Sequence, residues 1–326
     1  MNVHYSQEKN WYKGNLHLHS TRSDGQLTVA ALAEKYAAEN FDFIALTDHW
    51  QVPEPAVQKN DAPLLILDGT ELDGCDENGV YHHVVVIGAV TELLVANRDF
   101  IQTMDRAVKN GSLLIWAHPH WTGNSFDDGV MHPFHGLEVY NHVSHCENGS
   151  GSSLAHWDSM LEHRPDLLGF ATDDAHFTQG EPYWNGGWIM VNCESRTERD
   201  LLTAIRSGNF YSSQGPDFKT ITCNGDMVTV TTSPIMYARL IGPRREGYSI
   251  NGLDSGPFTE AVFTVPPHWS TARIEIEDEQ GKLAWTNPLF GRNSSKENCL
   301  ELHAGFPHPV ISDKKETTRY ENNSIQ

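Results

Sequence analysis

Short apolar runs that each end in a histidine or a carboxylate recur through the first two thirds of this chain. Of its 18 histidines, 15 lie before Phe177, so the imidazoles are concentrated in this part. The groups at either end of these runs or close beside it are, in chain order, His17, His19, Asp24, His49, Glu71, His83, His118, Asp174 and His176. In barrel-like α/β enzymes the working residues lie at the carboxyl ends of the strands. The pattern therefore predicts an α/β enzyme that gathers metal ligands at one end of its strands.

Apolar runs alternate with helical patterns up to residue 215, which indicates βα units. The predicted strands span residues 15–19, 41–47, 64–71, 83–89, 112–117, 136–140, 167–172 and 187–191. Several are continuously apolar, as expected for strands buried on both faces. The predicted helices span residues 28–40, 98–109, 153–163 and 195–207. In the last of them, Ser195 and Glu198 are predicted to form a capping box, and Gly208 to end the helix.

The character of the chain changes after Gly215 and Pro216. Three β-rich runs, at 227–232, 261–265 and 272–276, are separated by Asn-Gly, Gly-Pro and Pro-Pro turn signals. We therefore expect a catalytic domain over residues 1–215 and a small antiparallel β-rich domain over 216–305. A polar tail over 306–326 is expected to be mobile.

Charge and cysteine content narrow the class of protein. The formal net charge is −20, and binding to a polyanion needs clustered Lys and Arg, so we expect neither a nucleic-acid partner nor a membrane partner. Bound metal ions can still supply the local positive charge that a phosphate ester needs. The five cysteines form no CxxC pair, and the first six residues lack the basic start and apolar core of a signal peptide. We expect a cytoplasmic protein and leave its oligomeric state open.

The first three candidate ligands lie close together in the sequence. His17 and His19 are two residues apart on a predicted strand, so both side chains point to the same face. Asp24 follows in a loop, where Gly25 allows a tight turn. Two imidazoles and a carboxylate presented in this way can chelate a cation.

The next two candidates end separate apolar runs. Asp48 is interpreted as the partner that fixes the tautomer of His49, with a helix or turn cap as the alternative. Glu71 ends a run that cannot bury a free carboxylate unless that carboxylate is paired or bound to a metal. Because its two oxygens can bridge two cations, Glu71 is the candidate bridging ligand.

Neighbouring residues on a strand point opposite ways, so at most one of His82 and His83 is expected to be a ligand. His83 leads directly into the apolar run and is preferred, which leaves His82 as an exposed neighbour. His118 ends another run, and Pro119 breaks the strand after it.

Asp174 and His176 repeat the spacing of two residues after a further apolar run. Asp173 is the alternative carboxylate. Five further histidines around the run 136–141 are interpreted as facing solvent or substrate, with His145 the candidate to join the site; they are His120, His132, His135, His142 and His145.

These motifs resemble the PHP (polymerase and histidinol phosphatase) family of metal-dependent hydrolases. The resemblance covers residues 14–215 and rests on the order, spacing and flanks of the segments 17–25, 46–49, 117–119 and 174–176, together with Glu71 and His83. It implies a distorted (β/α)7 barrel, similar to a TIM barrel, with its site at the strand ends. It also implies two or three divalent ions, of zinc, manganese or iron, and a bacterial phosphoesterase-like branch with a C-terminal β module.

The resemblance further implies how the ions are shared. One ion would be held by His17, His19, Glu71 and Asp174. A second would be held by Glu71, His83 and His118, and a third by Asp24, His49 and His176. Because all nine positions carry competent ligands, the resemblance implies a trinuclear site.

The chain departs from the family pattern at one position. Many phosphoesterase members carry an arginine shortly after the His-Pro pair, whereas residues 118–124 here contain none. The aromatic variant with Trp121 is similar to a branch that includes carbamate and aryl-ester hydrolases. The general class is therefore predicted more firmly than the substrate.

The function predicted from these observations is hydrolysis of a small-molecule phosphomonoester or phosphodiester by a metal-activated hydroxide. A carboxyl-ester or carbamate hydrolase with the same site is the alternative, and a non-catalytic metal-binding protein is a third possibility. Glu71 and Asp174 are the predicted catalytic carboxylates, and His120 and His145 are candidates to protonate the leaving group. Five aromatic side chains are candidates for the wall of a substrate pocket or for ordinary core packing: Trp121, Phe126, Tyr140, Tyr183 and Trp184.

Overall fold

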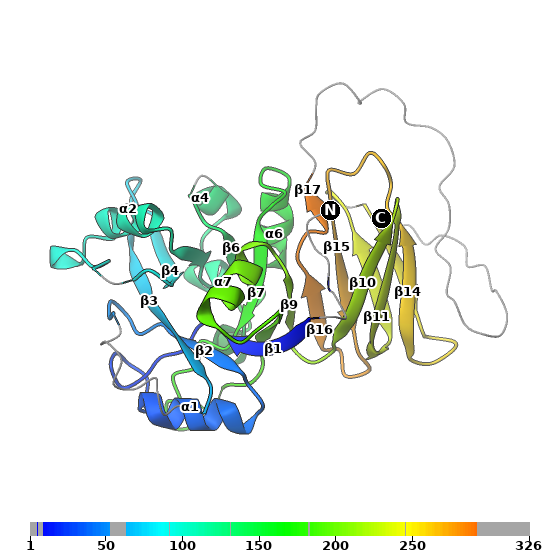
Figure 1. Cartoon of the computed structure of the whole chain (residues 1–326). Coiled ribbons are helices and arrows are strands. Elements are labelled where there is room, and N and C mark those ends of the chain that lie inside the picture. Colours follow the sequence, from blue (N-terminus) through cyan, green and yellow to red (C-terminus); the bar gives the residue numbers. More distant parts are fainter. Residues whose placement is uncertain are drawn as a thin grey trace.

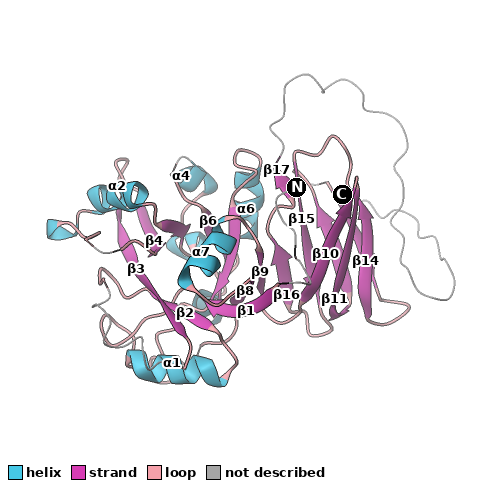
Figure 2. Cartoon of the chain, in the orientation of Figure 1, coloured by secondary structure: helices cyan, strands magenta, loops and turns pink. Residues whose placement is uncertain are grey.

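The computed structural model describes residue 5 and residues 9–52, 63–90, 92–130, 132–181, 183–244 and 246–291. Helices and connecting loops surround the first strands, and the later strands gather at the other end of the molecule (Figure 1). Figure 2 shows that this second part is built from strands. The predicted tail over 306–326 and the end of the predicted β-rich domain, 292–305, lie outside the described residues.

A mixed sheet organises the first part of the chain. Its strands β1 to β7 are neighbours in numerical order, and they are β1 (Asn10–Asn15), β2 (Phe43–Leu46), β3 (Leu65–Cys75), β4 (Tyr81–Ile87), β5 (Leu113–Trp116), β6 (Gly136–Asn141) and β7 (Leu168–Thr172). All neighbours pair in parallel except β4, which is antiparallel to both β3 and β5. The inner residues of β2 and β5 are fully buried, as the continuous apolar runs predict.

The reversal at β4 comes from a tight turn between β3 and β4. Oδ1 of Asp76 accepts hydrogen bonds from the backbone N–H groups of Asn78 and Val80, at 2.8 and 2.9 Å. An Asx-type turn of this kind lets the chain fold straight back, so no helix separates the two strands. The sequence of seven βα units is interrupted here.

The predicted (β/α)7 barrel is not confirmed, because the sheet does not close by a backbone ladder in the part of the chain that is described. On the far side of β1 the path continues antiparallel through β8 (Trp188–Cys193) and β9 (Phe210–Ser213). The end of the sheet at β7 still approaches this region, since Oγ of Ser212 donates to the carbonyl of Gly169 and accepts from the N–H of Ala171. A single bridge joins Leu18 to Ala175.

The segment with His17 and His19 is not part of the first strand, contrary to the prediction of a strand over 15–19. The strand β1 ends at Asn15, and its length is set by its pairing with β8, from Asn10 opposite Cys193 to Gly14 opposite Ile189. The next residues stay extended because the N–H of His19 donates to the carbonyl of Ala175, at 3.1 Å. His17 and His19 therefore point to the same side, as they would in a strand, although their segment belongs to none of the strands of the sheet.

The helices of this chain are short. They are α1 (Val29–Ala38), the 3₁₀ turn η1 (Ala96–Arg98), α2 (Phe100–Asn110), α3 (Pro119–Thr122), α4 (Phe126–Val130), α5 (His142–Asn148), α6 (Leu154–Leu161) and α7 (Glu198–Arg206). Within the described ranges, no helix has both the length and the apolar character needed to cross a lipid bilayer.

Local capping sets the helix ends, and one predicted cap is wrong. Thr28 and Asp99 cap α1 and α2. For α7 the cap is Thr197, whose Oγ1 accepts from the N–H of Asp200, and not Ser195. The helix therefore begins three residues later than predicted, and Gly208, with φ of 75°, follows its end as predicted.

The later strands are antiparallel, as predicted. They are β10 (Phe218–Asn224), β11 (Met227–Ile235), β12 (Tyr237–Ile241), β13 (Gly247–Asn251), β14 (Phe258–Thr264), β15 (Thr271–Glu277), β16 (Leu283–Thr286) and β17 (Phe290–Gly291). A three-stranded sheet, β10-β11-β14, packs over the others around a buried core. However, β16 pairs with β9, so the path β13-β12-β15-β16 continues the large sheet. The boundary at residue 215 remains a prediction.

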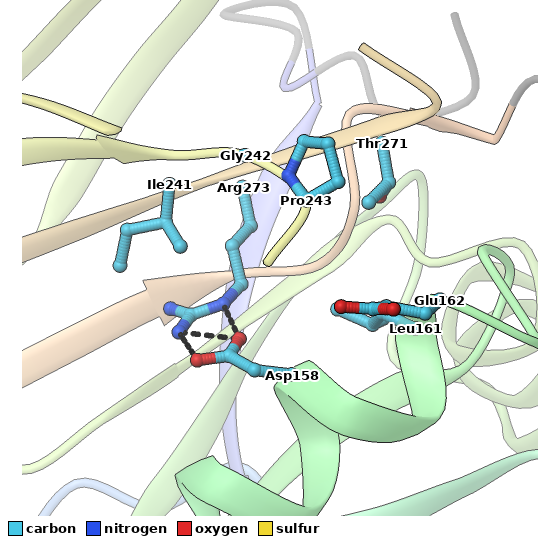
Figure 3. A pocket seen from close by; sticks show the side chains of 8 residues that line it. All are labelled: Asp158, Leu161, Glu162, Ile241, Gly242, Pro243, Thr271 and Arg273. Carbon is cyan, nitrogen blue, oxygen red and sulfur yellow. Dashed lines mark hydrogen bonds and ion pairs between the residues drawn. The ribbon is translucent and has the colours of Figure 1, made fainter. Parts of the chain in front are cut away.

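An ion pair also joins the two parts of the chain. Figure 3 shows the guanidinium of Arg273, on β15, against the carboxylate of Asp158, on α6. Nε and Nη2 of Arg273 donate to the two carboxylate oxygens at 2.9 and 3.0 Å. The arginine side chain is only 3% exposed and lies over the ring of Trp157. A two-pronged contact of this kind fixes orientation as well as distance.

Candidate metal centre

The carboxylate of Glu71 lies at the centre of a cluster of imidazoles. Glu71 is on β3, is 1% exposed, and carries the only carboxylate of the predicted set that touches five predicted histidines. Its Oε2 lies 3.1 to 3.4 Å from Nε2 of three rings, those of His17, His19 and His49. Its Oε1 lies 2.8 Å from Nδ1 of His83 and 3.3 Å from Nε2 of His118. The two oxygens therefore face different groups of imidazoles.

Asp174 closes the same cluster from the end of β7. Its Oδ1 lies 3.2 Å from Nε2 of His17 and 3.1 Å from Nε2 of His19. Its backbone has φ of 59°, and that of His118 has φ of 26°. Positive φ is costly for residues other than glycine and concentrates at functional sites. Both side chains are thus aimed by strained backbone.

Asp24 lies at the outer side of the cluster. Its Oδ2 is 3.3 Å from Nε2 of His176 and 3.7 Å from Nε2 of His49, and its Oδ1 is 3.4 Å from Nδ1 of His19. The Asp24 side chain is 52% exposed, unlike Glu71. The structure therefore brings all nine predicted ligands together, and it places Asp24 where the cluster meets solvent.

Sequence reasoning missed Glu138, which is fully buried on β6. Its Oε1 accepts from Nδ1 of His17 at 2.7 Å and from the hydroxyl of Thr172 at 2.8 Å. Its Oε2 accepts from the backbone N–H of His118 and from the amide of Asn141, both at 2.8 Å. One carboxylate thus orients two predicted ligands. The signal was a glutamate inside the apolar run 136–140, where a buried charge needs partners.

The prediction that Asp48 fixes the tautomer of His49 is wrong. Its carboxylate accepts from the N–H and hydroxyl of Ser20 and from the hydroxyl of Ser23, at 2.7 to 2.9 Å. It therefore holds the loop that carries Asp24. Nδ1 of His49 instead faces Oδ1 of Asp73, at 3.4 Å, a residue that sequence reasoning did not single out.

Asp173, the alternative carboxylate to Asp174, is engaged elsewhere. Its oxygens accept from the hydroxyl of Tyr36 and from the backbone N–H groups of Asn185, Gly186 and Gly187, at 2.7 to 3.0 Å. These bonds leave Asp174 as the carboxylate that points into the cluster.

His82 is not the exposed neighbour that was predicted. It is fully buried, because the face of β4 opposite His83 packs under α2 and against Trp116 and Phe134. His132, expected in a loop, lies beside it with ring centroids 4.8 Å apart.

At the centre of the cluster, burial and nearby groups of opposite charge shift the pKa of each side chain in opposite directions. Burial raises the pKa of Glu71, but the imidazole of His17 and hydrogen bonds from His118, His17 and His19 hold that pKa well below its ordinary range. Burial lowers the pKa of His19, yet hydrogen bonds to Asp174 and Glu71 raise it to about 9. In the absence of other cations, the carboxylates are therefore ionised and matched by protonated imidazoles.

A cavity of about 230 Å³ opens onto this cluster. Besides seven of the nine predicted ligands, its wall consists of Trp121, Val143, Ser144, Glu147, Phe177, Thr178, Glu181 and Tyr183. Trp121 and Tyr183 thus belong to the wall, as predicted, whereas Phe126, Tyr140 and Trp184 lie elsewhere. His120 and His145 are exposed and do not line the cavity; Nδ1 of His120 donates to the carbonyl of Ser152.

The residues present fit divalent metal ions. Nε2 of His17 and both ring nitrogens of His19 are buried, and the carboxylate oxygens that lie 3.1 to 3.4 Å from them do not complete a well-aligned hydrogen bond. Unpaired buried nitrogens cost free energy, and a cation between them and the carboxylates removes that cost. Three sets of ligand atoms lie within 4.8 Å of one another: His17, His19, Glu71 and Asp174; His19, Asp24, His49 and His176; and His49, Glu71 and His83. The mixed nitrogen and oxygen donors suit zinc, manganese or iron.

The fold is shared with a solved two-domain protein from Bacteroides vulgatus that contains a predicted PHP-like metal-dependent phosphoesterase. The two chains are 15% identical, the match covers 87% of this chain and 96% of the other, and the TM-score is 0.51. The resemblance to PHP proteins is therefore confirmed at the level of the fold, including the additional strands after the first part.

Two further solved structures match half of the chain. One, from Bifidobacterium adolescentis, is provisionally named a metal-dependent phosphoesterase (17% identity, 52% of this chain and 89% of that chain, TM-score 0.37). The other is an amidohydrolase from Chromobacterium violaceum with bound sulfate and no metal (16% identity, 52% and 89%, TM-score 0.37). No family model and no curated protein matches the sequence.

Proposed function

We propose that this chain is a metal-dependent phosphoesterase of the PHP family that cleaves a small phosphomonoester or phosphodiester. The observation that carries the proposal is the contact of one buried carboxylate, Glu71, with five imidazoles at the floor of a cavity. Buried charge arranged in this way and open to a small molecule is typical of a catalytic centre.

Glu71 is the proposed bridging ligand because its two oxygens face different imidazoles. His17, His19 and Asp174 complete one proposed ion site, His83 and His118 a second, and Asp24, His49 and His176 a third. Bound divalent ions supply Lewis acidity, which lowers the pKa of coordinated water and neutralises charge on the reacting ester.

The chain's own side chains orient these ligands and shape the cavity. Glu138 holds Nδ1 of His17, so that Nε2 of the same ring points to Glu71. Trp121 and Tyr183 supply the wall against which the alcohol part of the ester packs. Neither His120 nor His145 lines the cavity, so we assign neither of them the protonation of the leaving group.

A carboxyl-ester or carbamate hydrolase is the second candidate. In its favour, the described residues of the cavity wall include no lysine or arginine, but they do include Glu147 and Glu181. A wall of this charge does not itself attract a phosphate dianion. The third set of ligands favours the phosphoesterase, because a third ion matches the additional oxygen of a phosphoryl group.

The deciding experiment is a substrate panel on full-length protein of measured metal content. Aryl phosphomonoesters, phosphodiesters, carboxyl esters and carbamates with the same chromogenic leaving group are compared. We expect the highest kcat/KM on a phosphate ester. Glu71→Gln should lower that value by about 10²-fold or more, whereas Glu162→Gln, an exposed control at the C-terminal end of α6, should not.

Each outcome bears on the proposal. Highest turnover on a carboxyl ester or carbamate would select the second candidate. Bound metal without turnover on any ester would mean a non-catalytic metal-binding protein. Full turnover by Glu71→Gln would contradict the bridging role.

A further inference from the structure

A second cluster of ligating side chains lies on the outer face of β4, behind the centre described above. It consists of Asp76, His82 and His132, whose ligand atoms lie within 4.8 Å of one another. Oδ2 of Asp76 is 3.3 Å from Nε2 of His132 and 3.6 Å from Nε2 of His82. Three segments meet here: the turn between β3 and β4, the strand β4, and the loop after α4.

The buried histidine of this cluster, His82, lies too far from the carboxylate of Asp76 for a hydrogen bond, since Oδ2 of Asp76 is 3.6 Å from its Nε2. His82 is fully buried, and neither Nδ1 nor Nε2 forms a hydrogen bond with the described residues. The alternative to a metal site is that His82 is an ordinary core histidine beside the hydrogen-bonded pair of Asp76 and His132. Such a histidine normally satisfies at least one ring nitrogen, since an unpaired buried polar group costs about 1–3 kcal/mol.

The carboxylate is also fixed in place. Oδ1 of Asp76 accepts from the N–H groups of Asn78 and Val80, which leaves Oδ2 directed at the two imidazoles. The Asp76 side chain is 7% exposed and that of His132 is 26% exposed. The cluster is therefore buried at its base and reaches solvent on the side of His132.

The two clusters are separate because adjacent residues of a strand face opposite ways. His83 reaches Glu71 at 2.8 Å. The ring of His82 stacks on Phe100 on the other face, with an interplanar angle of 6°. Aromatic side chains around imidazole ligands exclude water and hold the rings in position.

We propose that Asp76, His82 and His132 form a separate site for a single divalent transition-metal ion such as zinc. Two imidazoles and one carboxylate are a known zinc donor set, with a fourth position for water on the exposed side. The ion fastens the β3–β4 turn to the loop after α4. Since β3 and β4 carry Glu71 and His83, this structural ion stiffens the strands under the first centre. The inference does not depend on the proposed function.

The test counts metal ions on the full chain. Protein stripped by a chelator is titrated with zinc, passed through gel filtration and analysed by mass spectrometry for zinc per chain. His132→Ala, the least buried ligand, and Asp76→Asn, which keeps an oxygen for Asn78 and Val80, should each bind one equivalent less than the wild type. His163→Ala, which replaces an exposed histidine outside both clusters, should bind as much as the wild type.

Crystals provide the second measurement. Zinc-edge anomalous scattering should show a peak between the three side chains, and the peak should persist in Glu71→Gln and vanish in Asp76→Asn. Unchanged zinc content in both variants, or anomalous peaks confined to the Glu71 cluster, would overturn the proposal. Loss of catalysis in Glu71→Gln with this peak retained would separate the two sites.

Discussion

The carboxylate of Glu138 lies 2.7 Å from Nδ1 of His17, and Nε2 of the same ring lies 3.1 Å from Oε2 of Glu71. A carboxylate can only accept, so Nδ1 carries the hydrogen and Nε2 is left with a lone pair when the ring is neutral. This arrangement prepares His17 as a metal ligand before any ion is present.

Glu138→Gln is therefore expected to weaken metal binding without unfolding the chain. The amide keeps the volume of the side chain but can present a donor to His17, so the ring loses its preferred tautomer. Replacing such a supporting carboxylate typically costs about 10–100-fold in metal affinity. Competition with a fluorescent chelator measures the change, and circular dichroism checks the fold. Unchanged affinity in a folded variant would show that Glu138 does not position the ring.

Metal uptake should be accompanied by release of protons. In the metal-free chain, Asp174 and Glu71 raise the pKa of His19 to about 9, so near pH 7 the ring holds a proton that an ion must displace. Apparent zinc affinity is expected to rise as the pH is raised from 6 toward 9. Calorimetry in buffers of different ionisation enthalpy gives the number of protons released. A value of zero at pH 7 would contradict this account.

The same shift predicts how the metal-free protein responds to pH. The pKa of His19 is higher in the folded chain than its ordinary value of about 6.5. The stabilisation from protonated His19 is therefore complete below pH 6.5 and is lost as pH rises through about 9. The free energy of unfolding of stripped protein, measured in urea, should fall over this range. His19→Gln should flatten that part of the curve.

Asp158→Asn should destabilise the contact between the two parts of the chain. It removes the charged partner of Arg273, whose guanidinium is 3% exposed, but Asp158 itself is 39% exposed, which limits the loss. We expect the free energy of unfolding to fall by about 1–3 kcal/mol, the usual size for a hydrogen bond to a charged group. Asp105→Asn, at an exposed position on α2, serves as the control. Equal unfolding curves for the two variants would mean that the ion pair contributes nothing.

Cysteine reactivity should follow burial. Burial raises the pKa of Cys193 to about 11, whereas Cys75 is exposed. Since the thiolate is the reactive form, iodoacetamide at pH 8 should modify Cys75 in the native chain and leave Cys193 unmodified. Peptide mass spectrometry measures both, and urea-unfolded protein is the control in which both react. Native modification of Cys193 at the rate of Cys75 would contradict the burial.

The pattern of apolar runs predicted the α/β class, the antiparallel strands after residue 215 and a set of nine side chains that the structure gathers in one place. These features depend on which residues end each run, and that is written in the chain itself. The four predicted helices lie within a few residues of α1, α2, α6 and α7, because caps are local: Thr28 and Gly208 act through their nearest neighbours. The short helices α3, α4 and α5 were not predicted.

The contacts between distant segments could be decided only by the folded chain. Glu138 meets His17 across 121 positions and Asp48 meets Ser20 across 28, and no local pattern specifies such partners. The Asx-type turn at Asp76 reversed β4, which interrupts the predicted series of βα units, and His82 was buried against Phe100 and Trp116. A sequence determines which side chains are available for chemistry, whereas packing decides which of them share a site, because burial and hydrogen bonding act between elements that meet only in space.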